Sequence, residues 1–315
     1  MMVFSIPRLI CGSATRMLVA MVVMAGIARA ETVPPIVDVA WLAQRVCGED
    51  LVVLDLRRSQ RNFEAEHVPC AVHSDYYNGG WRTVRDGVEN MVPDPARLEA
   101  LIGGLGIDND SHVVLVTAAL DMFSPAEVAR VYFIFRYLGH DRVSILEGGI
   151  GAWTAEWDND IEVGPVEPEA VTFVAKLRAD IIATRADVEV ALAEGSTLVD
   201  MRANDHFLGI NSSRVVLRPG SIPGAANLPM MWLVVDGELR YRTPEQLRRL
   251  WGVAGLDADA PQILFCNSGL ESSIGWLSLG GLLENTNVRL YDGSLADWSA
   301  DVTLPMVNRV PLADD

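Results

Sequence analysis

The chain carries two copies of one sequence pattern, and this internal repeat constrains its fold more than any other feature. An apolar run that ends in Asp-x-Arg occurs at 51–57 and again at 197–202. Three further pairs of similar segments follow in the same order, namely 66–71 with 220–225, 106–116 with 255–265, and 143–153 with 288–298. Four matches in one order predict two copies of a single domain.

The length of 315 residues, half of them hydrophobic, provides enough material for two packed cores. The stretch 158–170 is acidic, contains proline and lies between the copies. We therefore expect a first domain over 31–160 and a second domain over 170–315.

Within each copy, short runs rich in Val, Leu and Ile alternate with helical patterns such as 125–137 and 243–251. Thr243 is a good N-cap, and Pro244 suits the first helical position. Buried apolar strands that alternate with helices predict an α/β fold, with a parallel sheet in each domain and helices on both of its faces. In such sheets the chemistry lies at the carboxyl ends of the strands.

The N-terminal residues have the pattern of a secretory signal. Arg8 and Arg16 form a positively charged region before the apolar run 17–27, and residues 28–30 fit a small-residue cleavage site. This pattern predicts a signal peptide over 1–30 and export, which in a bacterium means the periplasm. An uncleaved anchor is the alternative, but the apolar run is short for a membrane span. After cleavage we expect no membrane association.

The four cysteines are Cys11, Cys47, Cys70 and Cys266, and cleavage leaves three of them. An odd number in an exported protein implies an unpaired thiol, and a Cys47–Cys70 disulfide stays open because nothing in the sequence favours it. With no C-x-x-C pair and five histidines, we expect no metal site. The net charge of −17 disfavours nucleic acid as a partner, and an anion would need a local cluster of Arg or N–H groups.

Cys266 follows the apolar strand 263–265 and precedes a helical pattern from about Ser272. The loop residues that we single out are Asn267, Ser268, Gly269, Leu270, Glu271 and Ser272. Small residues let such a loop direct its N–H groups inward, so we expect a lowered pKa for the Cys266 thiol. A buried core cysteine is the alternative. The first copy has Thr117 at the aligned position, and one competent copy beside one degenerate copy favours a functional cysteine.

On these motifs the chain resembles the tandem-domain rhodaneses, which are thiosulfate and 3-mercaptopyruvate sulfurtransferases. The resemblance covers nearly the whole chain after residue 30 and rests on four motifs: Cys266 with Gly269 and Ser272, Asp200-x-Arg202, the segment 219–225, and 291–294 with Trp298. It implies two rhodanese-like domains, of which the second is catalytic and the first inactive, and a site in the cleft between them. No cofactor is implied.

The resemblance also implies a mechanism. The Cys266 thiolate would take sulfur from thiosulfate or 3-mercaptopyruvate as a persulfide, and cyanide or a thiol would accept that sulfur. The implied partners are a small-molecule sulfur donor and acceptor, with a protein acceptor as a further candidate. The alternative function is an exported persulfide carrier or partner-binding module with little small-molecule turnover.

Four other residues enter through the resemblance. Arg202 matches a donor-binding arginine, with a structural ion pair to Asp200 or Glu271 as the equal alternative. Asp292 lies in a turn that frames the loop. His67 matches a histidine that is proposed to act with the loop serine, here Ser268, in the mercaptopyruvate branch, although we favour a surface or capping role.

The chain departs from the family pattern at several loop positions. Asn267 and Ser268 are neutral where thiosulfate-preferring members carry basic residues, and Cys-x-Ser-Gly is more similar to the mercaptopyruvate branch. Glu271 would oppose an anionic donor and the thiolate unless a cation such as Arg202 pairs with it. Phosphatases of this fold need Arg six positions after the cysteine, where this chain has Ser272, so we do not expect phosphatase activity.

Overall fold

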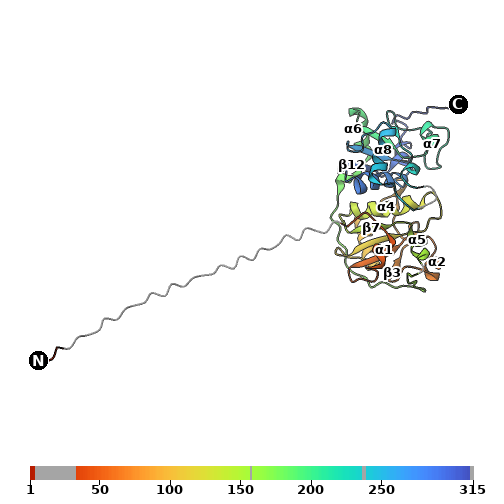
Figure 1. The fold of residues 1–315 in the computed structure, drawn as a ribbon. Coiled ribbons are helices and arrows are strands. Elements are labelled where there is room, and N and C mark those ends of the chain that lie inside the picture. Colours follow the sequence, from red (N-terminus) through yellow and green to blue (C-terminus); the bar gives the residue numbers. More distant parts are fainter. Residues whose placement is uncertain (4–32, 157, 236–238, 313–315) are drawn as a thin grey trace. The chain divides into compact units, whose positions relative to one another are not determined.

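A computed structural model describes residues 1–3, 33–156, 158–235 and 239–312 of the protein (Figure 1). Residues Thr32–Asp315 form one compact unit. Most of the expected signal peptide, including Cys11, lies outside the described residues.

The first copy folds as a parallel sheet with helices on both faces. Its strand order is β1 (Ile36–Val37), β7 (Val143–Leu146), β6 (His112–Val116), β2 (Leu51–Asp55) and β3 (Ala71–His73). On one face lie α1 (Val39–Ala43), α2 (Gln60–Ala65) and α5 (Gly149–Ala155), which contribute Leu42, Phe63 and Trp153 to one core. On the other face lie α3 (Pro95–Gly104) and α4 (Ser124–Tyr137).

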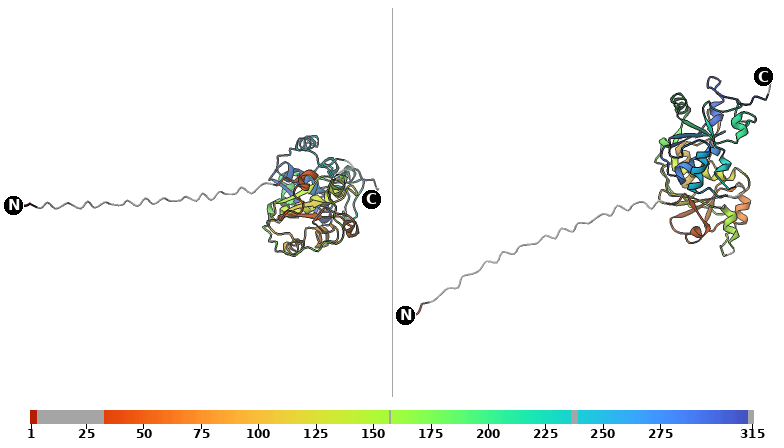
Figure 2. Two further views of the ribbon diagram at one scale, coloured as in Figure 1. Left: turned by 60° about the horizontal axis from the view of Figure 1, so that its bottom comes forward. Right: turned by 45° about the horizontal axis from the view of Figure 1, so that its top comes forward.

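The second copy repeats this arrangement element by element. Its parallel sheet has the order β8 (Ile182–Ala183), β12 (Val288–Tyr291), β11 (Gln262–Phe265), β9 (Thr197–Asp200) and β10 (Ala226–Asn227). One face packs on α6 (Arg185–Glu194) and α10 (Ser294–Trp298), and the other on α8 (Pro244–Val253) and α9 (Glu271–Trp276). In the two further views of Figure 2, the first copy is coloured orange to yellow and the second copy green to blue. The predicted fold class and repeat are confirmed.

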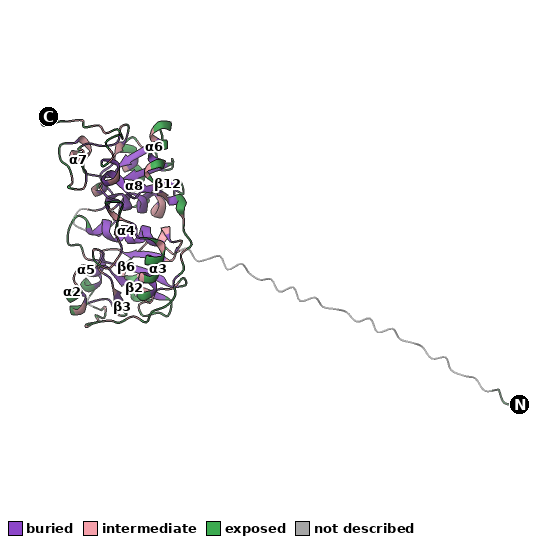
Figure 3. Cartoon of the chain, turned by 180° about the vertical axis from the view of Figure 1, so that it is seen from behind, coloured by how far each residue is buried: buried purple, intermediate pink, exposed green. Residues whose placement is uncertain are grey.

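The helices expected from the sequence form for the reasons given there. Thr243 caps α8 in a capping box with Gln246, and Pro244 occupies its first turn. The expected helix 125–137 is α4, which is buried along nearly its whole length because it lies inside the molecule (Figure 3). Short helices complete the second copy: α7 (Asn204–Leu208), η1 (Ala179–Ile181), η2 (Met230–Trp232) and η3 (Leu277–Leu282).

The two copies share one hydrophobic core through α4 and α9. Buried side chains from both sheets belong to the same core cluster, and α4 packs directly on α9. Phe133 of α4 meets Trp276 of α9 edge to face, with ring centroids 5.0 Å apart. The second copy therefore places α9 against the first copy.

Each copy also extends a segment onto the other. In the first copy this segment includes the antiparallel pair β4 (Thr83–Arg85) and β5 (Val88–Met91), after which the Val92 N–H donates to Asp292 (2.9 Å). In the second copy the Leu239 carbonyl accepts from the Gly148 N–H (2.9 Å), and Tyr241 donates to the Pro125 carbonyl (3.0 Å). Both turns that follow the last strand of a sheet are thus covered by the other copy.

The segment between the copies runs along the first one. The N–H groups of Val171 and Lys176 donate to the carbonyls of Gly103 and Leu138. The second sheet begins only at β8, so the boundary expected over 158–170 remains a prediction. Within the described residues, no helix combines the length and apolar character that a membrane crossing requires.

Cys47 and Cys70, whose pairing the sequence left open, form a disulfide with a Cα–Cα distance of 5.4 Å. The bond joins the turn before β2 to the turn before β3, two segments that the parallel sheet brings together. Among the described cysteines, Cys266 is the free one.

Candidate active site

Cys266 stands at the carboxyl end of the central strand of the second sheet. It follows β11 directly, as Thr117 follows β6 in the first copy. The main chain repeats around both residues: the Leu295 N–H donates to the Cys266 carbonyl (3.1 Å), and the Ile150 N–H donates to the Thr117 carbonyl (2.9 Å). The side chain of Cys266 is fully buried. The expected placement at a strand end is confirmed.

The residues after Cys266 curl back around its sulfur. Gly269 has a φ of 80°, which suits glycine, and α9 begins two residues later. The Ser272 hydroxyl lies 3.5 Å from the Cys266 sulfur. The backbone N–H groups of Ser268 and Ser272 also act to lower the pKa of Cys266. The loop therefore does present N–H and O–H donors to the sulfur.

Ser294, the first residue of α10, anchors this loop. Its hydroxyl oxygen accepts from the N–H groups of Cys266 and Gly269 (both 3.1 Å) and lies 4.0 Å from the Cys266 sulfur. Ser294 has a φ of 49°, in the left-handed region, where the first copy has Gly149 with a φ of 57°. A serine in this costly conformation supplies a hydroxyl that the first copy lacks. The sequence placed Ser294 in a framing turn.

The expectation of a lowered thiol pKa is wrong. Burial raises the pKa of Cys266, and the nearby negative charge of Glu271 raises it further. The hydroxyl of Ser272 and the loop N–H groups oppose this shift without overcoming it. The sequence showed the donors of the loop, but it could not show how completely the sulfur is removed from water.

Glu271 is the first residue of α9, and only 9% of it is exposed. The Asn267 amide donates to its carboxylate (2.9 Å). Burial is the main cause that raises the pKa of Glu271 to about 7, followed by the charge of Asp200, while Arg202 and Asn267 act in the opposite direction. The expected conflict between this carboxyl group and the thiolate is therefore present in the structure.

Arg202 forms the ion pair with Asp200 that was one of its two expected roles. Its Nε and Nη2 atoms donate to the Asp200 carboxylate, and Nη2 also donates to the Gly220 carbonyl (2.8 Å). Ser221 donates to the same carboxylate (2.6 Å). The Nη1 atom of Arg202 is buried without a hydrogen-bond partner, so its N–H groups remain for a bound anion. Donor binding by Arg202 stays a prediction.

Arg130 is a site residue that sequence reasoning missed. It extends from α4 of the first copy and forms a buried ion pair with Asp292 of the second copy. Its Nη1 atom also reaches the Gly269 carbonyl (3.4 Å) in the loop. Asp292 thus frames the loop, as expected, by holding a cation against it. A charged residue inside the apolar pattern 125–137 was the sequence signal for this contact.

Asn90 is a second missed residue, and it occupies the role considered for His67. The Asn90 amide, at the end of the β4–β5 pair, donates to the Ser268 hydroxyl (3.2 Å). His67 instead bonds to the Phe63 carbonyl (2.8 Å) and stacks on the Phe63 ring. It makes no hydrogen bond to Ser268, and its Nε2 atom is buried without a partner. The capping role holds, but a surface position is wrong because His67 is fully buried.

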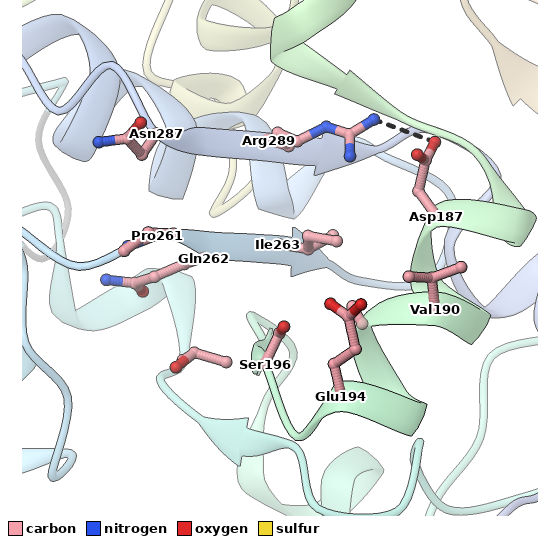
Figure 4. Close-up of a pocket in the computed structure, with 11 residues that line it drawn as sticks. Asp187, Val190, Glu194, Ser196, Pro261, Gln262, Ile263, Asn287 and Arg289 are labelled. Carbon is pink, nitrogen blue, oxygen red and sulfur yellow. Dashed lines mark ion pairs between the residues drawn. The ribbon is translucent and has the colours of Figure 1, made fainter.

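A separate cavity of about 250 Å³ lies between α6 and the amino-terminal ends of β9, β11 and β12 (Figure 4). Its walls include Gln262 at the amino end of β11 and an ion pair between Arg289 and Asp187. Cys266, which follows the carboxyl end of β11, is not among the residues that line this cavity. Across the described part of the chain, no group of three or more His, Cys, Asp or Glu side chains is arranged to hold a metal ion.

Comparisons with known proteins agree with this geometry. The family model of the rhodanese-like domain matches twice, over residues 38–156 and 184–301. The chain belongs to the rhodanese family. The 3-mercaptopyruvate sulfurtransferase of Escherichia coli is 30% identical over 277 residues, which are 84% of this chain and 95% of that protein. The thiosulfate sulfurtransferase of Cricetulus griseus is 32% identical over 279 residues, 84% and 91% of the two chains.

A solved structure supports the same assignment. The crystal structure of SseA from Escherichia coli, described as a 3-mercaptopyruvate sulfotransferase with the rhodanese fold, superposes with a TM-score of 0.72 at 26% identity. The match covers 83% of this chain and 99% of SseA. The chain is a two-domain rhodanese with sulfurtransferase function, as the sequence predicted.

The pKa of Glu271 predicts how stability depends on pH. A carboxyl group with a pKa raised from 4.5 to about 7 binds its proton more tightly in the folded state. The free energy of unfolding therefore falls as the pH rises between these two values. We expect Glu271→Gln to stabilise the protein by about 2 kcal/mol at pH 8 and to have little effect at pH 4.5. Urea unfolding at both pH values measures this. An equal change at both would contradict the assigned cause.

Proposed function

We propose that this rhodanese transfers sulfane sulfur through a persulfide on Cys266, with thiosulfate or 3-mercaptopyruvate as the donor and cyanide or a thiol as the acceptor. The observation that carries the proposal is the position of Cys266 inside a loop whose hydroxyl and N–H groups converge on its sulfur. The first copy has Thr117 at the same place and no such nucleophile. The donors are those of the sulfurtransferase relatives.

Loading of Cys266 breaks one bond of the donor. The thiolate attacks the outer sulfur of thiosulfate, the S–S bond breaks, and sulfite leaves with the electron pair. With 3-mercaptopyruvate the C–S bond breaks instead, and pyruvate leaves as its enolate and takes up a proton at carbon. In both cases the outer sulfur remains on Cys266 as a persulfide.

Unloading returns the cysteine to its first state. An acceptor thiolate attacks the outer sulfur, and the electron pair of the broken S–S bond goes back to Cys266, leaving the acceptor as a persulfide. Cyanide takes the same sulfur and leaves as thiocyanate. The Ser272 hydroxyl and the loop N–H groups act on the Cys266 sulfur, which supports a role in stabilising the thiolate that unloading restores. The Nη1 atom of Arg202 has no partner and would donate a hydrogen bond to the carboxylate of 3-mercaptopyruvate or the sulfonate end of thiosulfate.

Intact mass of the purified protein after incubation with each donor tests the proposal. We expect the wild-type protein to gain one sulfur atom, and Cys266→Ala to gain none. Addition of cyanide or a thiol should remove the added mass. Cys47 and Cys70 serve as an internal control, because they are joined in a disulfide and remain in the variant.

A different outcome would change the function. If neither donor loads Cys266 although its thiol reacts with a small alkylating agent, turnover of these small molecules is excluded. The alternative function, a persulfide carrier or binding module for a partner protein, would then be the better account of the intact loop.

We also propose that the protein is exported and that residues 1–30 are its signal peptide. The basic residues, apolar run and Ala-x-Ala pattern of this segment support the proposal. The Cys47–Cys70 disulfide adds support, because such bonds persist mainly in oxidising compartments.

The N-terminus of the protein recovered from cells tests export. We expect the periplasmic fraction of a bacterial host to contain protein that begins at Glu31. Ala28→Leu together with Ala30→Leu should block cleavage and leave residues 1–30 attached, because the small residues of the cleavage site are lost. Full-length protein confined to the cytoplasm would contradict the proposal.

A further inference from the structure

We propose that Glu271 selects the sulfur donor by charge, so that the site disfavours dianionic thiosulfate and favours a donor with a single negative charge such as 3-mercaptopyruvate. This inference rests on the proposed loading of Cys266. Glu271, an acidic residue by which this chain departs from the family loop, is then the residue that sets donor preference.

The position of Glu271 gives it a direct electrostatic effect on the reacting sulfur. It lies in the same loop as Cys266, five residues on, and is nearly removed from water. After burial, which is the main cause, its charge is the next contribution that raises the pKa of the Cys266 thiol. A negative charge that acts on the sulfur must also act on a donor that brings its own sulfur into contact with it.

The two fully buried cations beside the loop are already neutralised by other carboxylates. Arg202 is paired with Asp200, and Arg130 is paired with Asp292. Each of these buried pairs adds no net charge. An ionised Glu271 therefore adds a negative charge beside Cys266 that neither pair offsets, and the amide of Asn267 that binds it carries no charge. A further cation, Arg82, is joined to the loop through Asn90, whose amide donates to Ser268 and not to Glu271.

The other elements packed on α9 do not supply a compensating cation. Three of them, η2, η3 and β11, contain no ionisable side chain. On β12, Arg289 pairs with Asp187, and Tyr291 donates to Asp297. On α4, Glu127 is engaged by Arg58. In α4 the next cation after Arg130 is Arg136, which pairs with Asp141.

The consequence for the donors follows from their charge. Thiosulfate carries two negative charges and 3-mercaptopyruvate carries one carboxylate, so the ionised carboxylate of Glu271 repels thiosulfate more strongly. The pKa of Glu271, raised to about 7 by burial, places this repulsion within the neutral range. Discrimination against thiosulfate should increase from pH 6 to pH 8.

The test compares the two donors on the same cysteine with cyanide as the common acceptor. We would measure kcat/KM for thiosulfate and for 3-mercaptopyruvate at pH 6 and pH 8, in the wild type and in Glu271→Gln. The variant removes the charge and keeps an oxygen for Asn267. Any effect of the variant on folding or on the Cys266 thiolate is the same for both donors, so it cancels in the ratio of their kcat/KM values. Titration of the donors themselves is the same for both proteins, so it cancels when this ratio is compared between wild type and variant.

We expect Glu271→Gln to raise the ratio of thiosulfate to 3-mercaptopyruvate about tenfold at pH 8 and by much less at pH 6. Glu271→Ala should shift the ratio in the same direction. Glu194→Gln, which removes an exposed carboxylate at the end of α6, is the matched control and should leave the ratio unchanged.

A ratio that stays within twofold of the wild type at pH 8 in both Glu271 variants, while both donors still load Cys266, would overturn this inference alone. If the wild type and every variant fail to load from either donor, the proposed function fails first, and donor selection fails with it. The mass measurement on the wild type separates these two results.

Discussion

The packing of α4 on α9 is the contact on which the rest of the site depends. It joins two sheets that are otherwise complete by themselves into one core, and it buries the beginning of α9. Because the loop after Cys266 leads into α9, the same contact removes the sulfur from water. Arg130 reaches the loop only because α4 carries it there, and burial in turn requires its partner Asp292.

The two copies show how one backbone supports chemistry in one place and not in another. Thr117 and Cys266 both follow a central strand, and both carbonyls accept the N–H of the second residue of a helix, just after the turn that follows the last strand. In the first copy that turn contains Gly149 with a positive φ. In the second copy Ser294 takes the same conformation and contributes a hydroxyl to the loop. The difference in function is thus carried by a few side chains on a shared frame.

Much of this could be read from the sequence, because it depends on local pattern. The repeat gave the two sheets with the same strand order, and the position of Cys266 after an apolar run placed it at a strand end. The residues that were missed depend on contacts between the copies. Asn90 and Arg130 come from the first copy, and no spacing in the sequence places them near Ser268 or Gly269. The pKa of Cys266 depends on burial that arises when the copies pack together.

The disulfide and His67 illustrate a second limit, which arises inside the first copy. Cys47 and Cys70 are neighbours only because β2 and β3 pair in parallel, which the spacing of two cysteines does not reveal. His67 matched a family motif by position, yet its ring stacks on Phe63 inside the first copy. A motif match fixes the place of a residue in the chain, and its role follows from its contacts.

The central claim is that Cys266 holds transferable sulfur between two separate half-reactions. The most direct measurement is to incubate the protein with donor, remove the donor by gel filtration, and then add cyanide. The account predicts about one thiocyanate per protein molecule from the wild type and none from Cys266→Ser. Failure of the donor-free wild type to form thiocyanate, although it turns over when donor and cyanide are present together, would contradict the persulfide account.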